Sequence, residues 1–417
     1  SVTWDGSSST NWDVAANWDL GIIPRSSDTV IIPDVTTDPA ISDSDVTIVG
    51  LTVEAGGILT LNGKNLTIDG ALDCDGTITI TDAEVLNIGG DADFTNGTFN
   101  KANGSVQFSA NSNITLASNI FNHITINDGV IVTAQDTVEI DGNLTTAGTG
   151  TFDLNSKDLQ IATSLDLSSQ NITNISNNTV TFDATSGTQT ITSDGKSFSS
   201  VIFNDSGGST TFQLIDALDV DANFSLTDGI FDQNSKTINV GGNWTYAGGS
   251  FFSNVDIIFD TTATSIISGS TAFNNFTCDT AGKEILFSQG TTQTIAGTFT
   301  VTGAIGDLIT LGRSGGSGLD EWNINITGTP SVSYANISNS NTQGSTSQVP
   351  AYNSTDSGNN TNWIFNSLNI TYPSDGKTVD QTPTVIGVSG AGETITIKDI
   401  NGDTVATSDA DSSGNWR

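Results

Sequence analysis

The stretch that decides the fold runs from Ile58 to Ile88 and reads ILTLNGKNLTIDGALDCDGTITITDAEVLNI. It holds five short segments that alternate apolar and polar residues, and their starts lie six to eight residues apart. Gly, Asn and Asp, which favour turns, separate the segments. A β-sandwich gives turn signals only about every 8–12 residues. The tighter spacing therefore predicts a β-solenoid, in which each coil carries three short strands and successive coils stack about 4.8 Å apart.

The residue types along these segments assign an inside and an outside to each coil. Ile, Leu, Val and Phe occupy one set of alternating positions, and Thr, Ser, Asn and Asp occupy the other. Because successive side chains of a strand point to opposite faces, the apolar set would fill the interior of the coil. We expect an all-β protein whose residues 51–366 form a right-handed parallel β-solenoid, or β-helix.

Three longer copies of one pattern lie farther along the chain. Corresponding segments are SVQF (105–108), TVTF (179–182) and DIIF (256–259), and likewise FNHITI (121–126), FSSVIF (198–203) and FNNFTC (273–278). Corresponding segments lie 74 to 77 residues apart and keep the same order. Such a superrepeat is typical of architectures whose units stack on one another.

The composition supports the all-β prediction and limits the partners. Of the 46 acidic residues in the 417-residue chain, 40 are Asp, which favours turns, and six are Glu, which favours helices. The 11 basic residues leave a net charge of −35, so the chain lacks the basic footprint that nucleic-acid binding requires. No apolar run approaches the roughly 18 residues of a membrane-spanning helix, which predicts no membrane insertion.

The chain contains no Met, and we interpret Ser1 as the start of a mature chain from which a signal peptide has been removed. The two cysteines, Cys74 and Cys278, each follow strand-like residues, which predicts two buried free thiols. The acidity and the abundance of Asn, Thr and Ser favour a secreted, extracellular protein.

Aromatic residues mark both ends of the solenoid, where an open coil would expose its core and unpaired strand edges. Trp4, Trp12 and Trp18 fall within residues 1–50, which we interpret as an N-terminal cap and the first strands. An exposed tryptophan platform for glycans is the alternative interpretation. Trp363 and Phe365 would close the other end.

Residues 367–417 change character and predict a separate β-sandwich module. Edge and turn signals recur in this segment: Pro373, Pro383, Asn401–Gly402 and Gly414. Its length of about 50 residues supplies only half of the roughly 100 residues of an immunoglobulin-like sandwich, which would leave an apolar inner face uncovered. Three explanations stay open: a longer native chain, docking onto the same molecule's solenoid, or completion by a strand from a neighbour.

Several motifs resemble those of secreted bacterial β-solenoid surface proteins, the broad class that includes filamentous-haemagglutinin-like and autotransporter passenger regions. They are WDG, NWD and ANWD within residues 4–19, FNNFTC, GGNWTYAGGSF at 241–251, and VSYANISNS and STDSGNNTNWIF between residues 332 and 365. The tail is similar to the immunoglobulin-like repeats of large bacterial adhesins. The resemblance implies cell-surface display, adhesion, or construction of an extracellular layer or fibre, and it transfers no active-site residue.

We predict no enzymatic activity, although pectate lyases and polygalacturonases are enzymes built on β-solenoids. Their chemistry needs clustered carboxylates together with Arg, Lys or His. Here the three arginines lie far apart in sequence, and His123 is the only histidine, at a position that Ser or Asn occupies in the other copies. The arginines are Arg25, Arg313 and Arg417. Three of the eight lysines recur in one turn motif, which indicates a structural role: Lys64, Lys157 and Lys236.

Alternating carboxylates leave calcium as the one cofactor to consider. Pairs of this kind occur at Asp73 and Asp75, Asp91 and Asp93, and Asp219 and Asp221. The terminal Asp409, Asp411 and Ser412 copy the opening of a calcium-binding loop, but no Glu follows at its twelfth position. Alternation along a strand places both acids of a pair on the same outer face, where they can also be ordinary solvated residues.

Two functions from different classes follow from these observations. The first is an extracellular structural or adhesive surface protein, a rod-like unit of a cell-surface fibre, layer or adhesin that self-associates or binds surface glycans or proteins. The second is a carbohydrate-binding or carbohydrate-cleaving β-helix protein. Asn-x-Ser/Thr triplets such as those at Asn65 and Asn275 arise from composition and are weak indicators of N-glycans.

Overall fold

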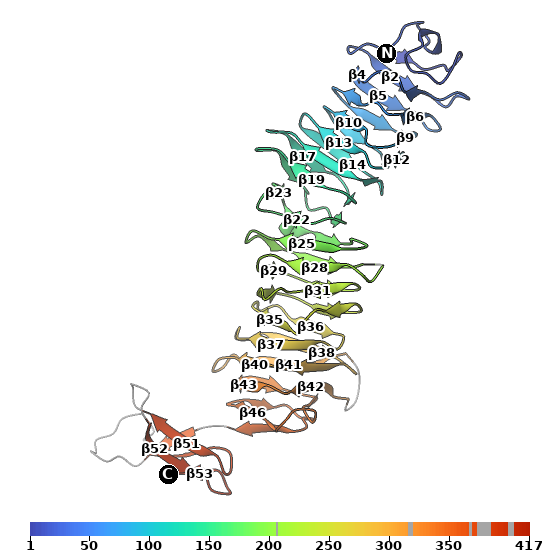
Figure 1. Cartoon of the computed structure of the whole chain (residues 1–417). Coiled ribbons are helices and arrows are strands. Elements are labelled where there is room, and N and C mark those ends of the chain that lie inside the picture. The colour runs from blue at the N-terminus through green and yellow to red at the C-terminus, as the bar shows by residue number, and fades with distance from the viewer. Residues whose placement is uncertain (206, 316–319, 367–368, 373–384, 399–403) are drawn as a thin grey trace. The chain divides into compact units, whose positions relative to one another are not determined.

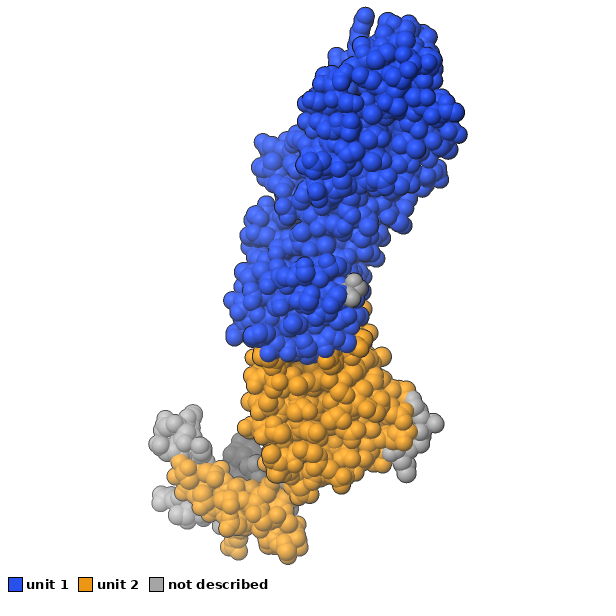
Figure 2. Space-filling model, turned by 45° about the vertical axis from the view of Figure 1, so that its right-hand side comes forward, with its two compact units in different colours: residues 1–221, 225–236, 248–252 blue, residues 222–224, 237–247, 253–417 orange. Residues whose placement is uncertain are grey.

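The computed structural model describes residues 1–205, 207–315, 320–366, 369–372, 385–398 and 404–417. In this part of the chain the helical elements are two short 3-10 turns, η1 (Ala15–Asn17) and η2 (Ile175–Asn177), and all other elements are strands. The all-β prediction is confirmed. The chain divides into two compact units (Figure 2): unit 1 comprises residues 1–221, 225–236 and 248–252, and unit 2 comprises residues 222–224, 237–247 and 253–417. Between them the units hold about 16 solenoid turns.

Unit 1 begins with three parallel sheets (Figure 1). The first contains β1 (Val2–Thr3), β2 (Thr29–Ile32), β5 (Gly50–Val53), β8 (Leu72–Cys74), β11 (Ala92–Asp93), β14 (Ser112–Thr115), β17 (Ile131–Ala134), β20 (Thr151–Asp153) and β23 (Ile172–Thr173). The second contains β4 (Val46–Ile48), β7 (Leu66–Ile68), β10 (Val85–Ile88), β13 (Ser105–Phe108), β16 (His123–Ile126) and β19 (Leu144–Thr146). The third contains β3 (Ala40–Ile41), β6 (Ile58–Leu61), β9 (Thr77–Ile80) and β12 (Thr98–Asn100).

The later coils of unit 1 continue with three strands each. One sheet contains β15 (Ile120–Phe121), β18 (Val138–Ile140), β21 (Leu159–Ile161), β24 (Thr179–Phe182) and β27 (Ser200–Phe203). Another contains β22 (Leu165–Asp166), β25 (Thr188–Thr192), β28 (Thr211–Leu214), β31 (Ile230–Asp232) and β34 (Ser250–Phe251). The strands β26 (Ser197–Phe198) and β29 (Leu218–Val220) also pair in parallel.

Unit 2 has the same parallel construction. One sheet contains β33 (Trp244–Tyr246), β36 (Ser265–Ser268), β38 (Glu284–Ser288), β41 (Ile309–Ser314), β44 (Ala335–Ile337) and β47 (Thr355–Asp356). A second contains β32 (Ile238–Val240), β35 (Val255–Phe259), β37 (Ala272–Cys278), β40 (Thr298–Thr302), β43 (Thr329–Ser333), β46 (Val349–Tyr352) and β48 (Trp363–Asn366). The strands β39 (Thr292–Ile295), β42 (Trp322–Ile326) and β45 (Ser340–Asn341) extend it.

In-register pairing explains why the sequence repeats its residue types. In the second sheet, Leu66 pairs with Leu86, Leu86 with Val106, and Val106 with Ile124, so one inward column is apolar through successive coils. None of these side chains is more than 1% exposed. Burying an aliphatic side chain completely stabilises the fold by about 1.5–3 kcal/mol. The parallel β-solenoid predicted from the 58–88 stretch is therefore confirmed.

Three tryptophans close the N-terminal end of unit 1. Trp4, Trp12 and Trp18 are each at most 2% exposed, and Trp18 makes edge contacts with both partners at centroid distances of 5.0 and 4.7 Å. The Trp18 indole Nε1 donates a 2.9 Å hydrogen bond to the Trp12 carbonyl. The cap prediction is correct. The glycan-platform alternative is wrong for these residues, because a buried ring offers no face to a sugar.

The last described solenoid strand of unit 2, β48, carries the second aromatic pair. Trp363 is 8% exposed, and its Nε1 donates a 3.0 Å hydrogen bond to Ser340 Oγ. The Trp363 and Phe365 ring centroids lie 6.3 Å apart. Trp363 therefore packs into the end of the stack, as predicted.

The tail of unit 2 is antiparallel and fits a small partial β-sandwich. β49 (Asn369–Tyr372), β50 (Ile386–Val388) and β53 (Asn415–Trp416) form one sheet, and β51 (Thr394–Lys398) pairs with β52 (Thr404–Asp409). Val405 is 66% exposed and Ile386 is 37% exposed, consistent with the apolar face expected to lie uncovered. Pro373, Pro383 and Asn401–Gly402 lie outside the described residues.

Both cysteines are buried and free, as predicted. Burial raises the pKa of the Cys74 thiol and of the Cys278 thiol to about 12, so both are protonated near neutral pH. Within the described ranges, no helix has the length and apolarity needed to cross a membrane.

Candidate functional site

Unit 1 carries an acidic pocket on the outer surface of four adjacent coils. Glu139 in β18 pairs with Gln160 in β21, and Gln160 pairs with Thr181 in β24. The same register sets Asp141, Ala162 and Asp183 in a row just after these strands. The small Ala162 side chain leaves space between the two aspartates, and a cavity of about 450 Å³ opens there. It is lined by Glu139, Asp141, Ala162, Asp183, Ala184, Thr185, Ser186 and Asn204.

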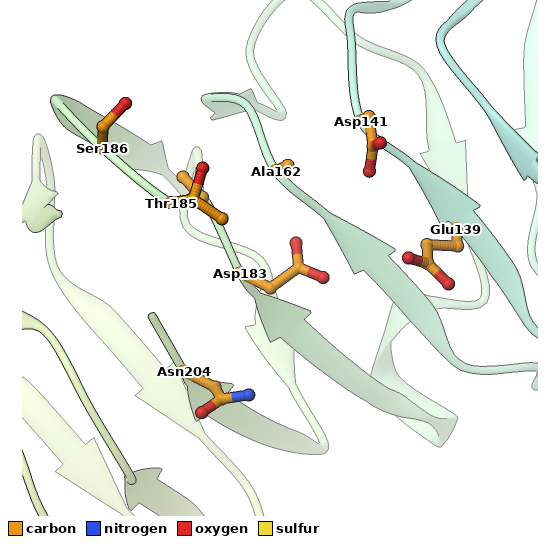
Figure 3. Close-up of a pocket in the computed structure, with 8 residues that line it drawn as sticks. Glu139, Asp141, Ala162, Asp183, Thr185, Ser186 and Asn204 are labelled. Atoms are coloured by element: carbon orange, nitrogen blue, oxygen red, sulfur yellow. The ribbon is translucent and has the colours of Figure 1, made fainter. Parts of the chain in front are cut away.

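Three carboxyl groups line this pocket, and one of them pairs with a lysine beside it. Figure 3 shows the Asp183 side chain extending from its strand toward Asp141 and Glu139. Lys101 forms an ion pair with Asp141 Oδ2, and both side chains are partly exposed to solvent. Only Asp141 of the three acids forms an ion pair within the described residues, which leaves the pocket with excess negative charge.

Burial and mutual repulsion perturb two of these acids. Burial, and after it the charges of Glu139 and Asp141, raise the pKa of Asp183 to about 6. Burial, and after it the charge of Asp141, also raise the pKa of Glu139, while Lys101 acts in the opposite direction. The Asp183 Oδ1 atom is buried and has no hydrogen-bond partner among the described residues. Asp183 is therefore the acid of this pocket that takes up a proton most readily.

This arrangement has some of the parts that general acid–base chemistry needs. A carboxyl group with a raised pKa, that of Asp183, lies beside other carboxyl groups, and such neighbours can divide the roles of acid and base. Among the described residues that line the pocket, however, there is no Arg or His. Nor do the described residues contain a group of three or more His, Cys, Asp or Glu side chains arranged to hold a metal ion.

The sequence interpretation did not identify Glu139, Asp141 or Asp183. The available signal was the coil length: Asp141, Ala162 and Asp183 are each 21 residues apart, close to one coil. The composition predicts that acids of this chain lie in turns, and it does not indicate which acids stack between coils.

The predicted calcium residues hold the tail together in this structure. Asp411 Oδ1 accepts hydrogen bonds from the backbone N–H groups of Ser413 at 2.8 Å and Asn415 at 3.0 Å. Asp409 Oδ1 accepts a 2.6 Å hydrogen bond from Thr394 Oγ1. Ser412, which follows Asp411, is exposed. Calcium binding at Asp409, Asp411 and Ser412 stays a prediction.

The other acidic pairs lie on outer faces, as the alternation requires. Asp73 and Asp93 are neighbours in adjacent coils of the first sheet. Burial, followed by the charges of Asp75 and Asp93, raises the pKa of Asp73. Asp91 Oδ1 accepts a hydrogen bond from the Asn113 N–H at 2.8 Å. The pair around Asp219 is likewise used in the stack, since Asp221 Oδ2 accepts a 2.9 Å hydrogen bond from Ser197 Oγ.

In the turn that contains the repeated lysine, asparagine and aspartate residues next to the lysine make the side-chain hydrogen bonds. Asn155 Nδ2 donates to the Ala134 carbonyl at 3.2 Å, and the corresponding Asn234 Nδ2 donates to the Leu214 carbonyl at 3.0 Å. The backbone N–H of each asparagine also bonds an aspartate two residues earlier. Both asparagines have a positive φ, of 48° and 51°, which Asn tolerates better than most residues. The repeated side-chain contacts of this turn thus come from Asn and Asp, whereas Lys157 and Lys236 take part through their backbone N–H groups, which donate to the carbonyls of Leu154 and Gln233.

Asparagines of the Asn-x-Ser/Thr triplets connect successive coils. Asn65 Oδ1 accepts from the Val85 N–H at 2.8 Å, and Asn275 Oδ1 accepts from the Thr298 N–H at 2.8 Å. Asn243 Oδ1 makes the same contact with the Ile266 N–H at 2.8 Å. These hydrogen bonds give the recurring asparagines a role in the stack that needs no glycan.

Unit 2 contains a buried lysine that the sequence patterns did not predict. Lys283 is fully buried, and its Nζ donates to the carbonyl of Ala263 at 2.7 Å and to that of Gly241 at 3.1 Å. The ammonium also lies 5.7 Å from the centroid of the Phe259 ring. Lys283 therefore joins two turns of the stack from inside.

The comparisons with known proteins add one match. Residues 3–117 match the model of a family described as a domain of unknown function (DUF8693). The matched segment contains the tryptophan cap and the strands of unit 1 through β14. No curated protein and no solved structure matches the chain.

Proposed function

We propose that this protein is an extracellular structural or adhesive surface protein, a unit of a cell-surface fibre, layer or adhesin. The observation that carries the proposal is the stack of about 16 turns whose polar side chains bond one coil to the next. In such a protein most residues serve to lengthen the stack and to join one coil to the next. The resemblance of its motifs to bacterial surface solenoids supports secretion and display.

The placement of aromatic side chains favours this function over glycan binding. All seven tryptophans lie in the described residues, and none is more than 8% exposed. Sugar-binding surfaces commonly stack sugars on exposed aromatic rings. Among the aromatic side chains whose exposure is described, which leaves out Tyr372, only Phe252 and Tyr352 are exposed.

The charge of the chain defines the chemistry of a partner. A net charge of −35 makes identical chains repel one another at low ionic strength. Lateral association therefore needs divalent cations or salt, and a protein partner would present a basic surface. Adhesion to such a surface would weaken as salt screens the attraction.

Electron microscopy of negatively stained native material, combined with fractionation of the producing cells, tests the proposal. We expect the protein in the surface fraction, as fibres, a layer or surface-attached stacks. A protein confined to the cell interior would overturn it. Titration with magnesium, calcium and sodium chloride then separates cation-bridged assembly from general screening.

The acidic pocket supports a second candidate, a carbohydrate-cleaving β-helix protein, because Asp183 has the raised pKa of a general acid. Release of reducing ends from a panel of neutral and cationic polysaccharides at pH 5–6 would measure it. If the pocket is catalytic, Asp183→Asn and Glu139→Gln abolish turnover while Asp82→Asn, an exposed acid elsewhere, leaves it unchanged. Equal product from all three variants would exclude this pocket as the active site.

A further inference from the structure

We propose that residues 105–178 form an exchangeable module of eleven strands, and that adding or removing one module turns the equivalent surface of the next copy to another side of the stack. The module begins at β13, and its second copy begins at β24. Both starting strands carry the same inward residues, Val106 with Phe108 and Val180 with Phe182. This inference concerns the construction of the stack and does not rest on the proposed function.

Strands that correspond by sequence are always eleven places apart in this part of the chain. FNHITI forms β15 and β16, and FSSVIF forms β26 and β27. Strand β14 buries a polar residue two positions before an isoleucine, and β25 does the same: Ser112 with Ile114, and Gln189 with Ile191. A buried polar residue is uncommon in this core, so its recurrence indicates equivalent positions.

Side-chain contacts repeat with the same offset. Asn155 follows β20 and donates to Ala134 at the end of β17. Asn234 follows β31 and donates to Leu214 at the end of β28. The strands of the second contact are each eleven places later than those of the first, so the two copies share a side-chain contact as well as a sequence pattern.

Eleven strands do not make a whole number of coils. After β1, which pairs with β2, the strands of unit 1 pair with strands three places away, so a coil contains three strands. The module therefore spans three coils and two further strands. Corresponding strands must therefore fall in different sheets. Strand β13 lies between β10 and β16, whereas β24 lies between β21 and β27 in another sheet. The one-residue corner at Asn122 is likewise found again at Ser199, between other sheets.

The register shows that the copies can replace one another. At present Leu86 pairs with Val106 and Ile88 with Phe108. Joining Gly104 to Thr179 would place Val180 and Phe182 in those two positions. The next contact is also preserved, because Val180 already pairs with Val201 and Phe182 with Phe203, as Val106 and Phe108 pair with Ile124 and Ile126.

The rotation has a consequence for binding. Outward residues of corresponding strands in unit 1 face different sides, so a flat surface can engage only one copy at a time. A partner that recognises a feature of the module would have to bind from more than one side. Adding or removing a module would then change the length of the stack, while each remaining module would keep its own outward residues.

Two deletions in the full chain test the module. Deleting residues 105–178 removes eleven strands, and deleting residues 105–157 removes eight, β13 to β20. Each deletion removes a whole number of three-strand coils plus two further strands. Both deletions therefore move the strands that follow to the same new sheets. Only the longer deletion joins corresponding sequences. In repeat proteins stability is close to a sum over units and their interfaces, so size alone favours the shorter deletion.

We expect the 105–178 deletion to keep a β-type circular dichroism spectrum and to melt cooperatively within about 5 °C of the full chain. The 105–157 deletion should melt much lower or aggregate. A variant with residues 105–178 duplicated in tandem should also fold. If the 105–178 deletion is no more stable than the 105–157 deletion, or if the duplicated chain fails to fold, the module is not exchangeable and the inference is wrong.

Discussion

The backbone N–H of Asn143 donates a 2.8 Å hydrogen bond to Nδ1 of His123, which lies one coil earlier. Asn275 accepts the corresponding bond from Thr298 with its Oδ1 atom, also at 2.8 Å. The only histidine of the chain therefore stands where an asparagine acceptor stands elsewhere. This contact requires a neutral imidazole with its proton on Nε2. At a position that Ser or Asn occupies in the other copies, His123 thus makes a contact between coils of the same kind as Asn275.

Replacing His123 with Asn should preserve stability, whereas replacing it with Ala should lower it. Asn can supply the same acceptor, but Ala leaves the Asn143 N–H without its side-chain partner, which costs about 1 kcal/mol. Urea denaturation followed by circular dichroism measures the difference. Equal loss in both variants would show that ring packing, rather than the hydrogen bond, is what His123 contributes.

Asp183→Asn should stabilise unit 1 at neutral pH. The pKa of Asp183 is raised to about 6 in the fold, above its value near 3.9 in an unfolded chain, so the fold favours the protonated form. Its contribution to stability is greatest below pH 4 and is lost as the pH rises through 6. The amide removes that loss, and the gain at pH 7–8 is about 1 kcal/mol after allowance for solvent screening.

The pH profile of the unfolding free energy distinguishes this effect from a general change in charge. The difference between Asp183→Asn and the unaltered chain should vanish near pH 4. The exposed acid Asp82 provides the matched control, because its replacement with Asn removes the same charge outside the pocket. A gain that is independent of pH, or equal in the two variants, would contradict repulsion within the pocket as the cause.

Trp18→Ala should open the N-terminal cap and cost about 3–5 kcal/mol, because it removes a fully buried ring together with its contacts to Trp4 and Trp12. Trp18→Phe keeps an aromatic ring and loses the hydrogen bond to the Trp12 carbonyl, so its cost should be about 1 kcal/mol. Hydrogen exchange of residues 2–41 would follow the opening. No change in exchange there after Trp18→Ala would refute a capping role.

Lys283→Ala should destabilise unit 2 by about 2–4 kcal/mol, since it leaves a cavity in the stack. Lys283→Met should cost less than about 1 kcal/mol, because a buried cation has a desolvation penalty that Met avoids. Gly241 would still receive a 2.7 Å hydrogen bond from Thr261 Oγ1. Thermal unfolding compares both variants with the unaltered chain, and a loss for Met as large as that for Ala would show that Lys283 contributes through its ammonium group rather than through its volume.

The pH dependence of unfolding gives a second test of Lys283. Burial lowers the pKa of this lysine in the fold below its value near 10.4 in an unfolded chain. The unfolded state then binds more protons in that interval, so stability contributed at this site rises with pH toward 10. The rise should be absent in Lys283→Met, and its persistence there would assign it to other groups.

Local patterns in the sequence were sufficient to predict the parallel solenoid. The alternation and the spacing of six to eight residues from Ile58 to Ile88 fix which side chains are inside and how short each strand is. The hydrophobic burial of those side chains then admits few other folds. The tryptophans of the cap were also predictable, because an exposed coil end needs large apolar side chains to cover it.

The acidic pocket and the buried lysine depend on contacts between coils and could not be read from local patterns. Asp141 and Asp183 lie 42 residues apart in the sequence, and the stacking of coils brings them to the same side of the solenoid, with only the small Ala162 between them. Sequence periodicity gives the approximate coil length, but corners of one to several residues make the register uncertain. The pKa of an acid depends on that register, through burial and through the charges placed beside it.

The sequence by itself determined the fold class, the superrepeat and the cap. Each of them depends on residue types and spacings that can be recognised along the chain. The tertiary structure alone decided that the superrepeat contains eleven strands, so that its copies in unit 1 fall in different sheets. It also decided which polar groups meet across coils, as His123 meets Asn143. The physical reason is that hydrogen bonds and charges act over a few ångströms in space, between residues that lie about one or two coils apart along the chain.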